Sequence, residues 1–201
     1  MKVQLLRMTE RPAEVISSAA GTSYGKEDYS FKRIKTCFNK GHLSVFEHVD
    51  ITWRIEGISR SCSHQLVRHR LASFTEKSLR YTKIKDDDWY VIPEGIKQQG
   101  LHAINKFKEV MKRDKETYFD YIDSGIKPED ARFALPLATK TDVTTTMNLR
   151  EFLHFLDLRL DPNAQWEIRE LASKMMHMVQ VRLYNVGAKD LSELIFSKYK
   201  R

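Results

Sequence analysis

Residues 68–81 read RHRLASFTEKSLRY, and the rest of the chain is organised around this stretch. It gathers three arginines with a histidine, a lysine, a carboxylate and several hydroxyl groups, and it has little apolar content. Arginines this close together repel one another, so we expect a fold that holds them in place to supply anions. Phosphates are the obvious anions, because the planar guanidinium matches phosphate oxygens bidentately. A solvated basic loop is the plainer alternative.

The residues before this stretch predict a strand followed by a helix. Apolar and polar side chains alternate from Val49 to Glu56, which is typical of a strand in an antiparallel sheet with one covered face, and Gly57 should end it. Residues 59–69 then follow helical spacing, so Arg68 and Arg70 should fall at or just past a helix C-terminus. Basic side chains there stabilise the helix dipole by about 0.3–1 kcal/mol without a ligand. That effect explains one arginine and leaves the rest of the stretch unexplained.

The composition is ordinary for a soluble globular protein. The 201 residues suit a single domain over 1–201, with 41% hydrophobic and 30% charged residues. No apolar run is long enough to span a bilayer, and charge interrupts the N-terminus too early for a signal peptide. We therefore expect a cytoplasmic protein without a membrane partner. The net charge of +7 and the pI of about 9.3 fit phosphorylated ligands, nucleic acid or solubility alone.

Neither the cysteines nor the acidic run predicts a metal site. Cys37 and Cys62 are the only cysteines, which excludes a disulfide framework and a four-cysteine zinc site. Both have apolar neighbours at helical spacing, so each is expected to be a small buried hydrophobe rather than a nucleophile. The aspartates at 86–88 lack further ligands at suitable spacing, and we expect a solvated loop there.

Two long helices are expected in the second half of the chain. Residues 96–123 predict one continuous helix with a solvated outer face, after a short strand at 89–92. Residues 162–187 predict the last long helix, and Asp190 with Glu193 should cap a shorter one after it.

A capped helix between these two carries polar groups on two faces. Asn148 and Glu151 have the spacing of a capping box, which opens a helix that runs to about residue 160. Arg150 and His154 share one face of it, whereas Arg159 lies nearer the apolar stripe. Two polar faces indicate that Arg159 serves a different ligand from the other pair. Alternatively, His154 is only a partly exposed helix residue.

The chain resembles a known enzyme family through the stretch at its centre. Arg68-His69-Arg70, seven further residues and Ser78 reproduce the RHR-x7-S signature of the flavin-dependent thymidylate synthases, the ThyX family. That signature alone is a moderate signal. It is strengthened by matching segments in the family's order over roughly residues 41–168, namely Gly41-His42, Phe46-Glu47-His48, Ala131-Arg132, Leu135-Pro136-Leu137, Asn148-Leu149-Arg150, Phe155-Leu156-Asp157-Leu158-Arg159 and Ala164-Gln165-Trp166-Glu167.

The resemblance implies a fold, a reaction and an assembly. The fold is α/β of the α+β type, with a twisted, mainly antiparallel sheet flanked by helices. The reaction is the conversion of dUMP to dTMP, in which 5,10-methylenetetrahydrofolate donates one carbon, FAD is the redox cofactor and NADPH restores the reduced flavin. The assembly is a homotetramer whose active sites are shared between subunits. Since the chain has no G-x-G-x-x-G motif, FAD should be held in a manner specific to this family.

The matching positions imply two sets of ligand-binding residues. The flavin set is Ser44, Arg68, His69, Arg70, Glu76, Asn148, Leu149, Arg150 and His154. The dUMP set is Gln65, Leu66, Val67, Arg68, Glu76, Lys77, Ser78, Leu79, Arg80, Arg132 and Arg159. Arg159 is also the implied catalytic residue, because a fixed guanidinium stabilises negative charge that develops on the uracil ring.

Four positions need separate comment. Ser78 is assigned to binding, because no base is positioned by sequence to activate it and the family's mechanism requires no enzyme nucleophile. Ser44 stands where threonine is common and His154 where some members carry asparagine, and both keep a polar group. His42 matches a position near the flavin.

Two other classes of protein remain as alternatives. A basic, non-catalytic nucleic-acid-binding protein explains the charge and the arginines, but it does not explain Glu76 among them or Arg132 and Arg159 far along the chain. A phosphotransferase with His69 as nucleophile lacks the glycine that normally follows such a histidine, and it lacks a clear second catalytic histidine. We therefore expect the thymidylate synthase, with no nucleic-acid partner.

Overall fold

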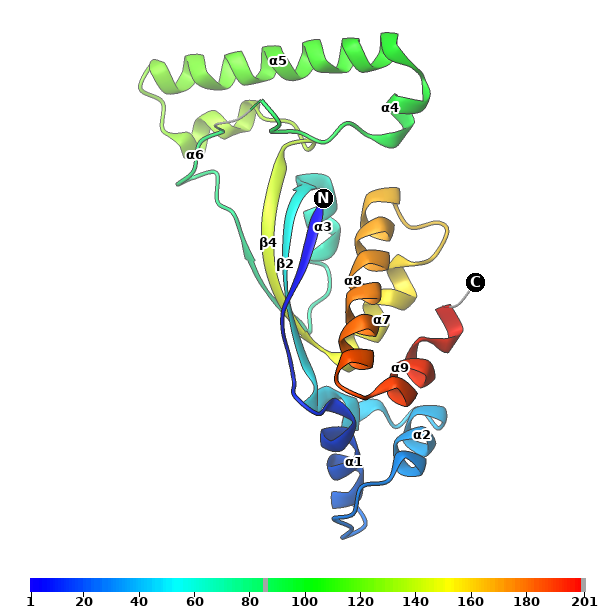
Figure 1. Cartoon of the computed structure of the whole chain (residues 1–201). Helices are drawn as coiled ribbons and strands as arrows, with labels where there is room; N and C mark the ends of the chain where they lie inside the picture. The colour runs from blue at the N-terminus through cyan, green and yellow to red at the C-terminus, as the bar shows by residue number, and fades with distance from the viewer. Residues whose placement is uncertain (85–86, 200–201) are drawn as a thin grey trace. The chain divides into compact units, whose positions relative to one another are not determined.

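The computed structural model describes residues 1–84 and 87–199 (Figure 1). The chain forms two compact units. The first unit comprises Met1–Lys2, Ile55–Arg68 and Thr75–Val143, and the second comprises Val3–Arg54, His69–Phe74 and Thr144–Arg201. Asp86, the first aspartate of the acidic run, lies outside the described residues.

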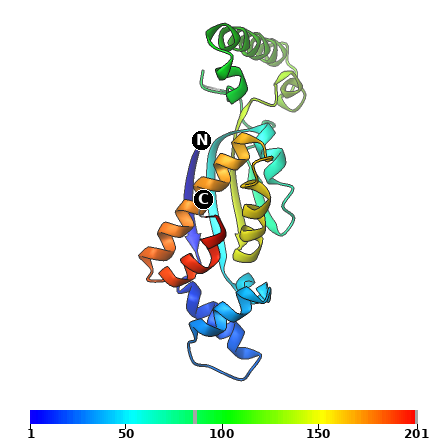
Figure 2. The ribbon, with the colours of Figure 1, turned by 90° about the vertical axis from the view of Figure 1, so that its right-hand side faces the viewer.

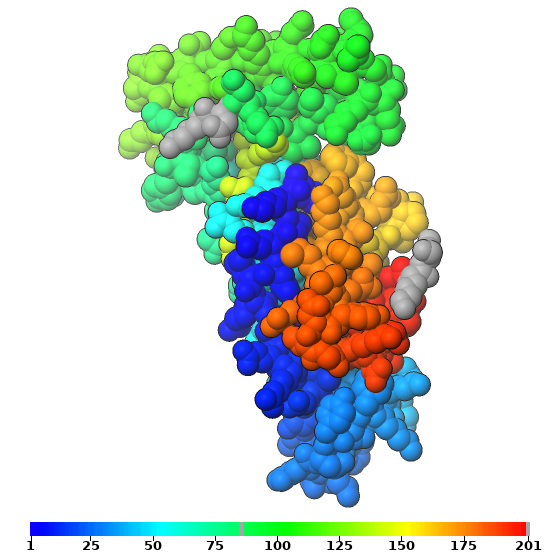
Figure 3. All heavy atoms as spheres, viewed as in Figure 1, coloured from blue at the N-terminus to red at the C-terminus, as the bar shows by residue number. Residues whose placement is uncertain are grey.

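A four-stranded, mainly antiparallel sheet confirms the expected α/β fold class. Its spatial order is β1-β2-β4-β3, and its strands are β1 (Lys2–Met8), β2 (Asp50–Ser59), β3 (Ala72–Glu76) and β4 (Lys140–Asn148). Strand β1 is an edge strand with mostly exposed or half-buried side chains, and its residues lie at the surface in the space-filling view, in blue (Figure 3).

The predicted alternation in β2 is confirmed, but its predicted end is wrong. Ile51, Trp53 and Ile55 are completely buried, while the intervening residues are exposed or half-buried. Gly57 does not end the strand, which continues to Ser59. Its φ of 72° lies in the left-handed region that glycine adopts without strain, so the chain bends locally and resumes the strand.

Strands β3 and β4 do not follow from the sequence pattern, and one predicted strand is wrong. The buried face of β4 consists of Thr141, Val143, Thr145 and Met147, so a threonine-rich inner face hides the alternation of polarity. Strand β3 lies inside the basic stretch, where apolar residues are few. At the predicted strand 89–92, the structure has an isolated bridge between Tyr90 and Thr139.

The second unit is built on helices that pack along its part of the sheet. Helices α7 and α8 run beside the strands in both ribbon views (Figures 1 and 2). The rings of Trp53 on β2 and Phe152 on α7 lie 4.9 Å apart, and both side chains are completely buried. The helices of this unit are α1 (Pro12–Thr22), α2 (Phe31–Asn39), η1 (Leu43–His48), α7 (Leu149–Arg159), α8 (Trp166–Asn185), α9 (Lys189–Phe196) and η3 (Ser197–Tyr199).

The capping prediction for α7 is confirmed, whereas the predicted starts of the last two helices are wrong. The Asn148 side chain accepts a hydrogen bond of 2.9 Å from the backbone N–H of Glu151. Helix α8 begins at Trp166, because the Gln165 side chain accepts from two backbone N–H groups of its first turn. The residues before it, from Asp161, form a turn. Helix α9 begins without a side-chain cap at Ala188.

The first unit contains the helices between β2 and β4. They are α3 (Arg60–Leu66), α4 (Glu94–Gln98), α5 (Leu101–Asp123), α6 (Pro128–Ala131) and η2 (Arg132–Ala134). The prediction of one helix over 96–123 is wrong, because Gly100, with φ 88°, separates α4 from α5. Ile84, Trp89 and Met111 form the centre of this unit's apolar cluster. Within the described part of the chain, no helix combines the length and apolar character needed to cross a bilayer.

Both cysteines are free, as expected. Cys62 is completely buried in α3, which confirms its role as a small hydrophobe. Cys37 on α2 is half-buried. Helix α3 ends at Leu66, so Arg68 does lie just past a helix C-terminus.

Candidate active site

The second unit brings His69, Glu151 and Arg159 into direct contact. His69 lies between β3 and the end of α3 in sequence, and its side chain is buried. Its Nδ1 is 3.3 Å from Oε1 of Glu151, and its Nε2 is 3.1 Å from Nε of Arg159. The predicted catalytic arginine and a predicted flavin-binding histidine are therefore neighbours.

The surroundings of His69 keep its ring neutral. Burial, together with the positive charges of Arg159 and His154, lowers the pKa of His69 to about 4, and burial is the largest of these causes. Burial also raises the pKa of the Glu151 carboxyl, which the charges of His154 and Arg150 oppose. At neutral pH His69 is thus an uncharged hydrogen-bonding group. A phosphotransferase nucleophile must be exposed, and the buried ring of His69 therefore argues against that alternative.

Ring contacts with α7 fix the plane of the His69 imidazole. The ring of Phe155 lies 5.0 Å away at an interplanar angle of 73°, and that of His154 lies 6.1 Å away. Ligand atoms of His69, Glu151 and His154 all lie within 4.8 Å of one another, which is a spacing that could hold a metal ion. Both ring nitrogens of His69 already face hydrogen-bond partners, and Arg159 adds positive charge. The cluster is therefore better explained as a hydrogen-bonded group.

Asn148, Leu149 and Arg150 of the flavin set form the start of α7. Asn148 caps the helix, and Leu149, its first residue, is completely buried. Arg150 is exposed and forms an ion pair with Glu47 on η1, the short helix that also carries Ser44. Arg70 follows His69 and is exposed. Exposed cations and a capped helix N-terminus thus occur together in this unit.

In the first unit, helix α3 holds the end of β3. Oε1 of Glu76 accepts hydrogen bonds from Arg60, at 3.2 Å, and from the Ser63 hydroxyl, at 2.9 Å. The other terminal nitrogen of Arg60 donates to the backbone carbonyl of Lys77 at 2.9 Å. Burial lowers the pKa of the Arg60 guanidinium, Glu76 opposes this shift, and Arg132 adds to it. Glu76 and Lys77, both predicted to bind ligand, are therefore positioned by Arg60.

Two arginines of the dUMP set meet at one glutamate. Arg80 donates to the Glu129 carboxylate, with Nη2 at 2.9 Å, and Nε of Arg132 donates to the Glu129 backbone carbonyl at 3.0 Å. The Ser78 hydroxyl accepts from the backbone N–H of Arg80 at 3.2 Å. The Arg80 guanidinium also lies 5.6 Å from the centre of the Tyr81 ring. Serine, arginine and arginine are thus assembled as an anion-binding group would require.

Other members of the dUMP set offer less through their side chains. Leu66 is completely buried and Leu79 nearly so, which leaves their backbone atoms as the groups available to a ligand. Gln65 is half-buried, whereas Val67 and Arg68 are exposed. Nζ of Lys77 lies 3.8 Å from Oδ2 of Asp142, so the two side chains form an ion pair.

No sequence pattern marked Arg60, Ser63 or Glu129 as a site residue, and Glu151 was expected only as a capping residue. The spacing of Arg60 and Ser63, three residues apart at the start of a helix, places them on one face and was a usable signal. Glu129 lies just before the Ala131-Arg132 segment of the resemblance. Glu151 is four residues from Phe155 and eight from Arg159, which places all three on one side of α7.

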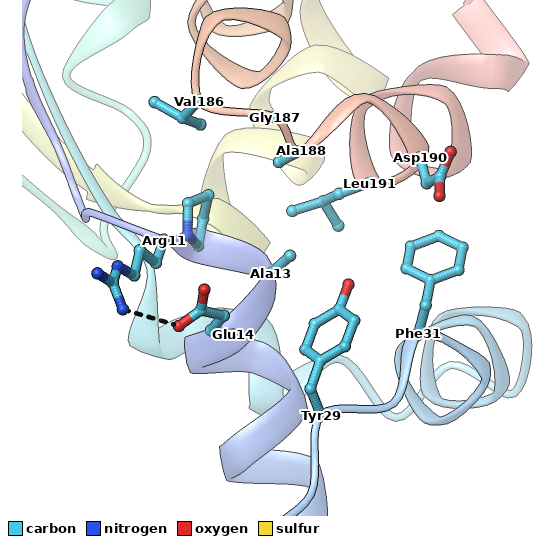
Figure 4. Close-up of a pocket in the computed structure, with 11 residues that line it drawn as sticks. Arg11, Ala13, Glu14, Tyr29, Phe31, Val186, Gly187, Ala188, Asp190 and Leu191 are labelled. Atoms are coloured by element: carbon cyan, nitrogen blue, oxygen red, sulfur yellow. Dashed lines mark hydrogen bonds and ion pairs between the residues drawn. The ribbon is translucent and has the colours of Figure 1, made fainter.

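A cavity of about 300 Å³ lies elsewhere in the second unit (Figure 4). Its charged and polar side chains include Arg11, Glu14, Tyr29 and Asp190, the last of which lies in the first turn of α9. Arg11 and Glu14 form an ion pair of 3.5 Å. None of the predicted ligand-binding residues lines this cavity, so it is separate from the candidate site.

Comparison with known proteins gives a consistent result. Residues 4–183 match the sequence model of the family described as "Thymidylate synthase complementing protein". The chain is 44% identical over 196 residues to the flavin-dependent thymidylate synthase of Pyrococcus furiosus, covering 90% of this chain and 80% of that protein. It is 38% identical over 191 residues to the enzyme of the same name from Geobacter sulfurreducens, covering 90% and 82%.

The fold is also similar to a solved structure. A crystal structure of the flavin-dependent thymidylate synthase ThyX from Helicobacter pylori, complexed with FAD and dUMP, matches with a TM-score of 0.76. The match covers 92% of this chain and 97% of that one, at 23% sequence identity.

Proposed function

The chain belongs to the family of thymidylate synthase complementing proteins, and on that basis we propose that it is a flavin-dependent thymidylate synthase that converts dUMP to dTMP. The observation that carries this proposal is the family match over residues 4–183. The reaction needs a carbon donor and a reductant, and we assign 5,10-methylenetetrahydrofolate and NADPH to these roles by the family resemblance.

The second unit has side chains that fit FAD. Arg70 and Arg150 are exposed cations, and α7 presents a capped N-terminus at Asn148. Cations and a helix N-terminus both favour the oxygens of a pyrophosphate. We propose that Ser44, His69, Leu149 and His154 of this unit also hold FAD, and the family resemblance assigns Arg68 and Glu76 to the same cofactor. When bound, FAD supplies the reducing equivalents of the reaction.

The first unit has side chains that fit the phosphate of dUMP. Ser78 and Arg80 provide a hydroxyl and a guanidinium two residues apart, and Glu129 ties Arg80 to Arg132. We propose that these three residues bind the nucleotide with Gln65, Leu66, Val67, Arg68, Glu76, Lys77 and Leu79. Arg60 supports the set by fixing Glu76 and the Lys77 carbonyl.

Arg159 is the proposed catalytic residue. Its guanidinium is anchored through Nε on a neutral His69, so its position does not depend on the ligand alone. A preorganised cation stabilises negative charge as it develops on the uracil ring, and it need not give up a proton to do so. No enzyme nucleophile is required, and Ser78 serves binding.

We further propose one domain over residues 1–201, assembled as a cytoplasmic homotetramer with shared sites. All four strands contribute residues to both units, which supports a single domain. Val181 and Tyr184 on α8 are large apolar residues that are 44% and 47% exposed, as expected of a subunit contact. Two free cysteines suit a reducing compartment.

The visible absorption spectrum of the purified protein tests this function first. We expect a flavin spectrum that bleaches with NADPH in the absence of oxygen, and that bleaches faster when dUMP is present. Formation of dTMP on addition of 5,10-methylenetetrahydrofolate completes the test. A colourless protein that does not take up added FAD, but binds DNA or RNA with steep salt dependence, would support the nucleic-acid-binding alternative instead.

A further inference from the structure

Glu151 is a buried carboxylate that none of the assigned roles explains. It is only 6% exposed, and a carboxylate is costly to bury without hydrogen-bond partners. Its position in the first turn of α7 favours an acidic or amide side chain, but glutamine serves a capping box as well as glutamate does. The helix therefore does not explain why this position carries a buried charge.

The donors and acceptors around His69 fix the position of its proton. The Nε atom of Arg159 can only donate, so Nε2 of His69 must accept at 3.1 Å and carries no hydrogen. A neutral imidazole has one N–H, which then lies on Nδ1 and points to the Glu151 oxygen 3.3 Å away. Arg159 donates to His69, and His69 donates to Glu151. A carboxylate that only accepts enforces this tautomer, whereas an amide tolerates both.

One side of α7 supplies every part of this arrangement except the imidazole itself. Glu151, Phe155 and Arg159 are spaced four residues apart, so they lie along one side of the helix. His69 contacts all three, with the Phe155 ring 5.0 Å from its own. The packing fixes the plane of the ring, and Arg159 and Glu151 together fix which nitrogen carries the proton.

We infer that Glu151 is a positioning residue, which holds Arg159 in its working orientation through the tautomer of His69. This inference rests on the proposed function, because it gives Glu151 a role in the thymidylate synthase reaction. If the side chain at position 151 could pair with both tautomers of His69, as an amide can, a fraction of the molecules would carry the imidazole N–H on Nε2. That N–H would then face the N–H of Arg159. Arg159 would then lose its anchor in those molecules, while the fold would keep its capped helix.

A double-mutant cycle on the flavin-loaded enzyme tests this role. Glu151→Gln should lower kcat for dTMP formation about 10-fold, with little change in KM for dUMP. A loss of this size is typical when the hydrogen-bond partner that orients a histidine ring is removed, as in metal sites. In a His69→Gln background, where the amide oxygen can itself accept from Arg159, the same substitution should change kcat less than about 2-fold. The matched control is Glu170→Gln, an exposed glutamate on α8 that pairs with Lys174.

Equal losses in both backgrounds would overturn the inference, because they would show a structural role for Glu151. An unchanged kcat in Glu151→Gln, in an enzyme that makes dTMP, would overturn it too. Failure of the wild-type protein to bind FAD or to form dTMP would instead refute the proposed function.

Nitrogen-15 NMR spectra of protein labelled at histidine report which ring nitrogen of His69 carries the proton. This measurement does not depend on activity, so it also applies to variants that lose flavin. His69, assigned by its loss in His69→Asn, should show a protonated Nδ1 and an unprotonated Nε2 in the wild type. A proton on Nε2 there would refute the inference whatever the kinetics show. In Glu151→Gln both ring forms should appear.

Discussion

Acidification should destabilise the folded chain through His69. The perturbation is a change from about pH 7.5 to about pH 5, compared between the wild type and His69→Asn. The folded pKa of His69 is about 4, below the 6.5 of the unfolded chain, so the unfolded chain binds the proton more readily. The contribution of this group is therefore complete above about pH 6.5 and is lost as the pH falls toward 4.

The size of the effect follows from these two values. With a pKa of about 4 in the folded state and 6.5 in the unfolded state, the linkage relation gives a loss of about 2 kcal/mol at pH 5 relative to pH 7.5. The Asn variant has no imidazole to protonate, so it should lack this part of the pH dependence. The amide of asparagine can still donate a hydrogen bond to Glu151 from near the position of Nδ1, so this variant keeps that contact.

Urea unfolding followed by tryptophan fluorescence measures the effect, because Trp53 is completely buried in the same unit. The free energy of unfolding of the wild type should exceed that of His69→Asn by about 2 kcal/mol more at pH 7.5 than at pH 5. His102→Asn, at an exposed position on α5, is the matched control and should follow the wild type. Parallel pH dependence in wild type and His69→Asn would refute the reasoning.

Three further substitutions test the site and the core. Arg159→Ala should lower kcat about 100- to 1000-fold while FAD binding persists, measured by dTMP formation and flavin absorbance; a loss under about 5-fold contradicts its catalytic role. Arg60→Met should weaken dUMP binding, measured by calorimetry, about 10-fold, because Glu76 loses a charged hydrogen bond. Arg113→Met, at an exposed position on α5, is the control. Equal dUMP affinities in the two variants would argue against positioning by Arg60. Phe152→Ala should lower the free energy of unfolding by about 3–5 kcal/mol in urea, against less than about 0.5 kcal/mol for Leu158→Ala on the exposed side of α7.

Local sequence patterns predicted those parts of the fold in which polarity follows burial. Strand β2 and the capped start of α7 are such cases, because apolar residues face the core and Asn148 has a single clear capping role. Strand β4 has threonines on its buried face, so no contrast in polarity marks it. Gly57 and Gly100 show a further limit. Both adopt a positive φ, yet one continues a strand and the other breaks a helix, and only tertiary pairing decides between these outcomes.

The candidate site was predictable where a family motif marks it, but not where support comes from a distance. Arg159 and His69 are 90 positions apart, and periodicity within one helix gives no sign of their hydrogen bond. Glu151 fitted a capping box, and that local explanation concealed its contact with His69. Arg60 likewise has an ordinary helical setting, and its role becomes visible only when β3 lies beside α3.

The position of β4 in the sheet has a consequence for synthesis. It is the last strand to leave the ribosome, yet it lies between β2 and β3. Until β4 has emerged, β3 has no strand to pair with, and the edge of β2 that will bind β4 stays open. Unpaired edges are templates for association with other chains. A nascent or truncated chain that stops short of residue 148 should therefore be prone to aggregation, and chaperone demand should peak before α7 is made.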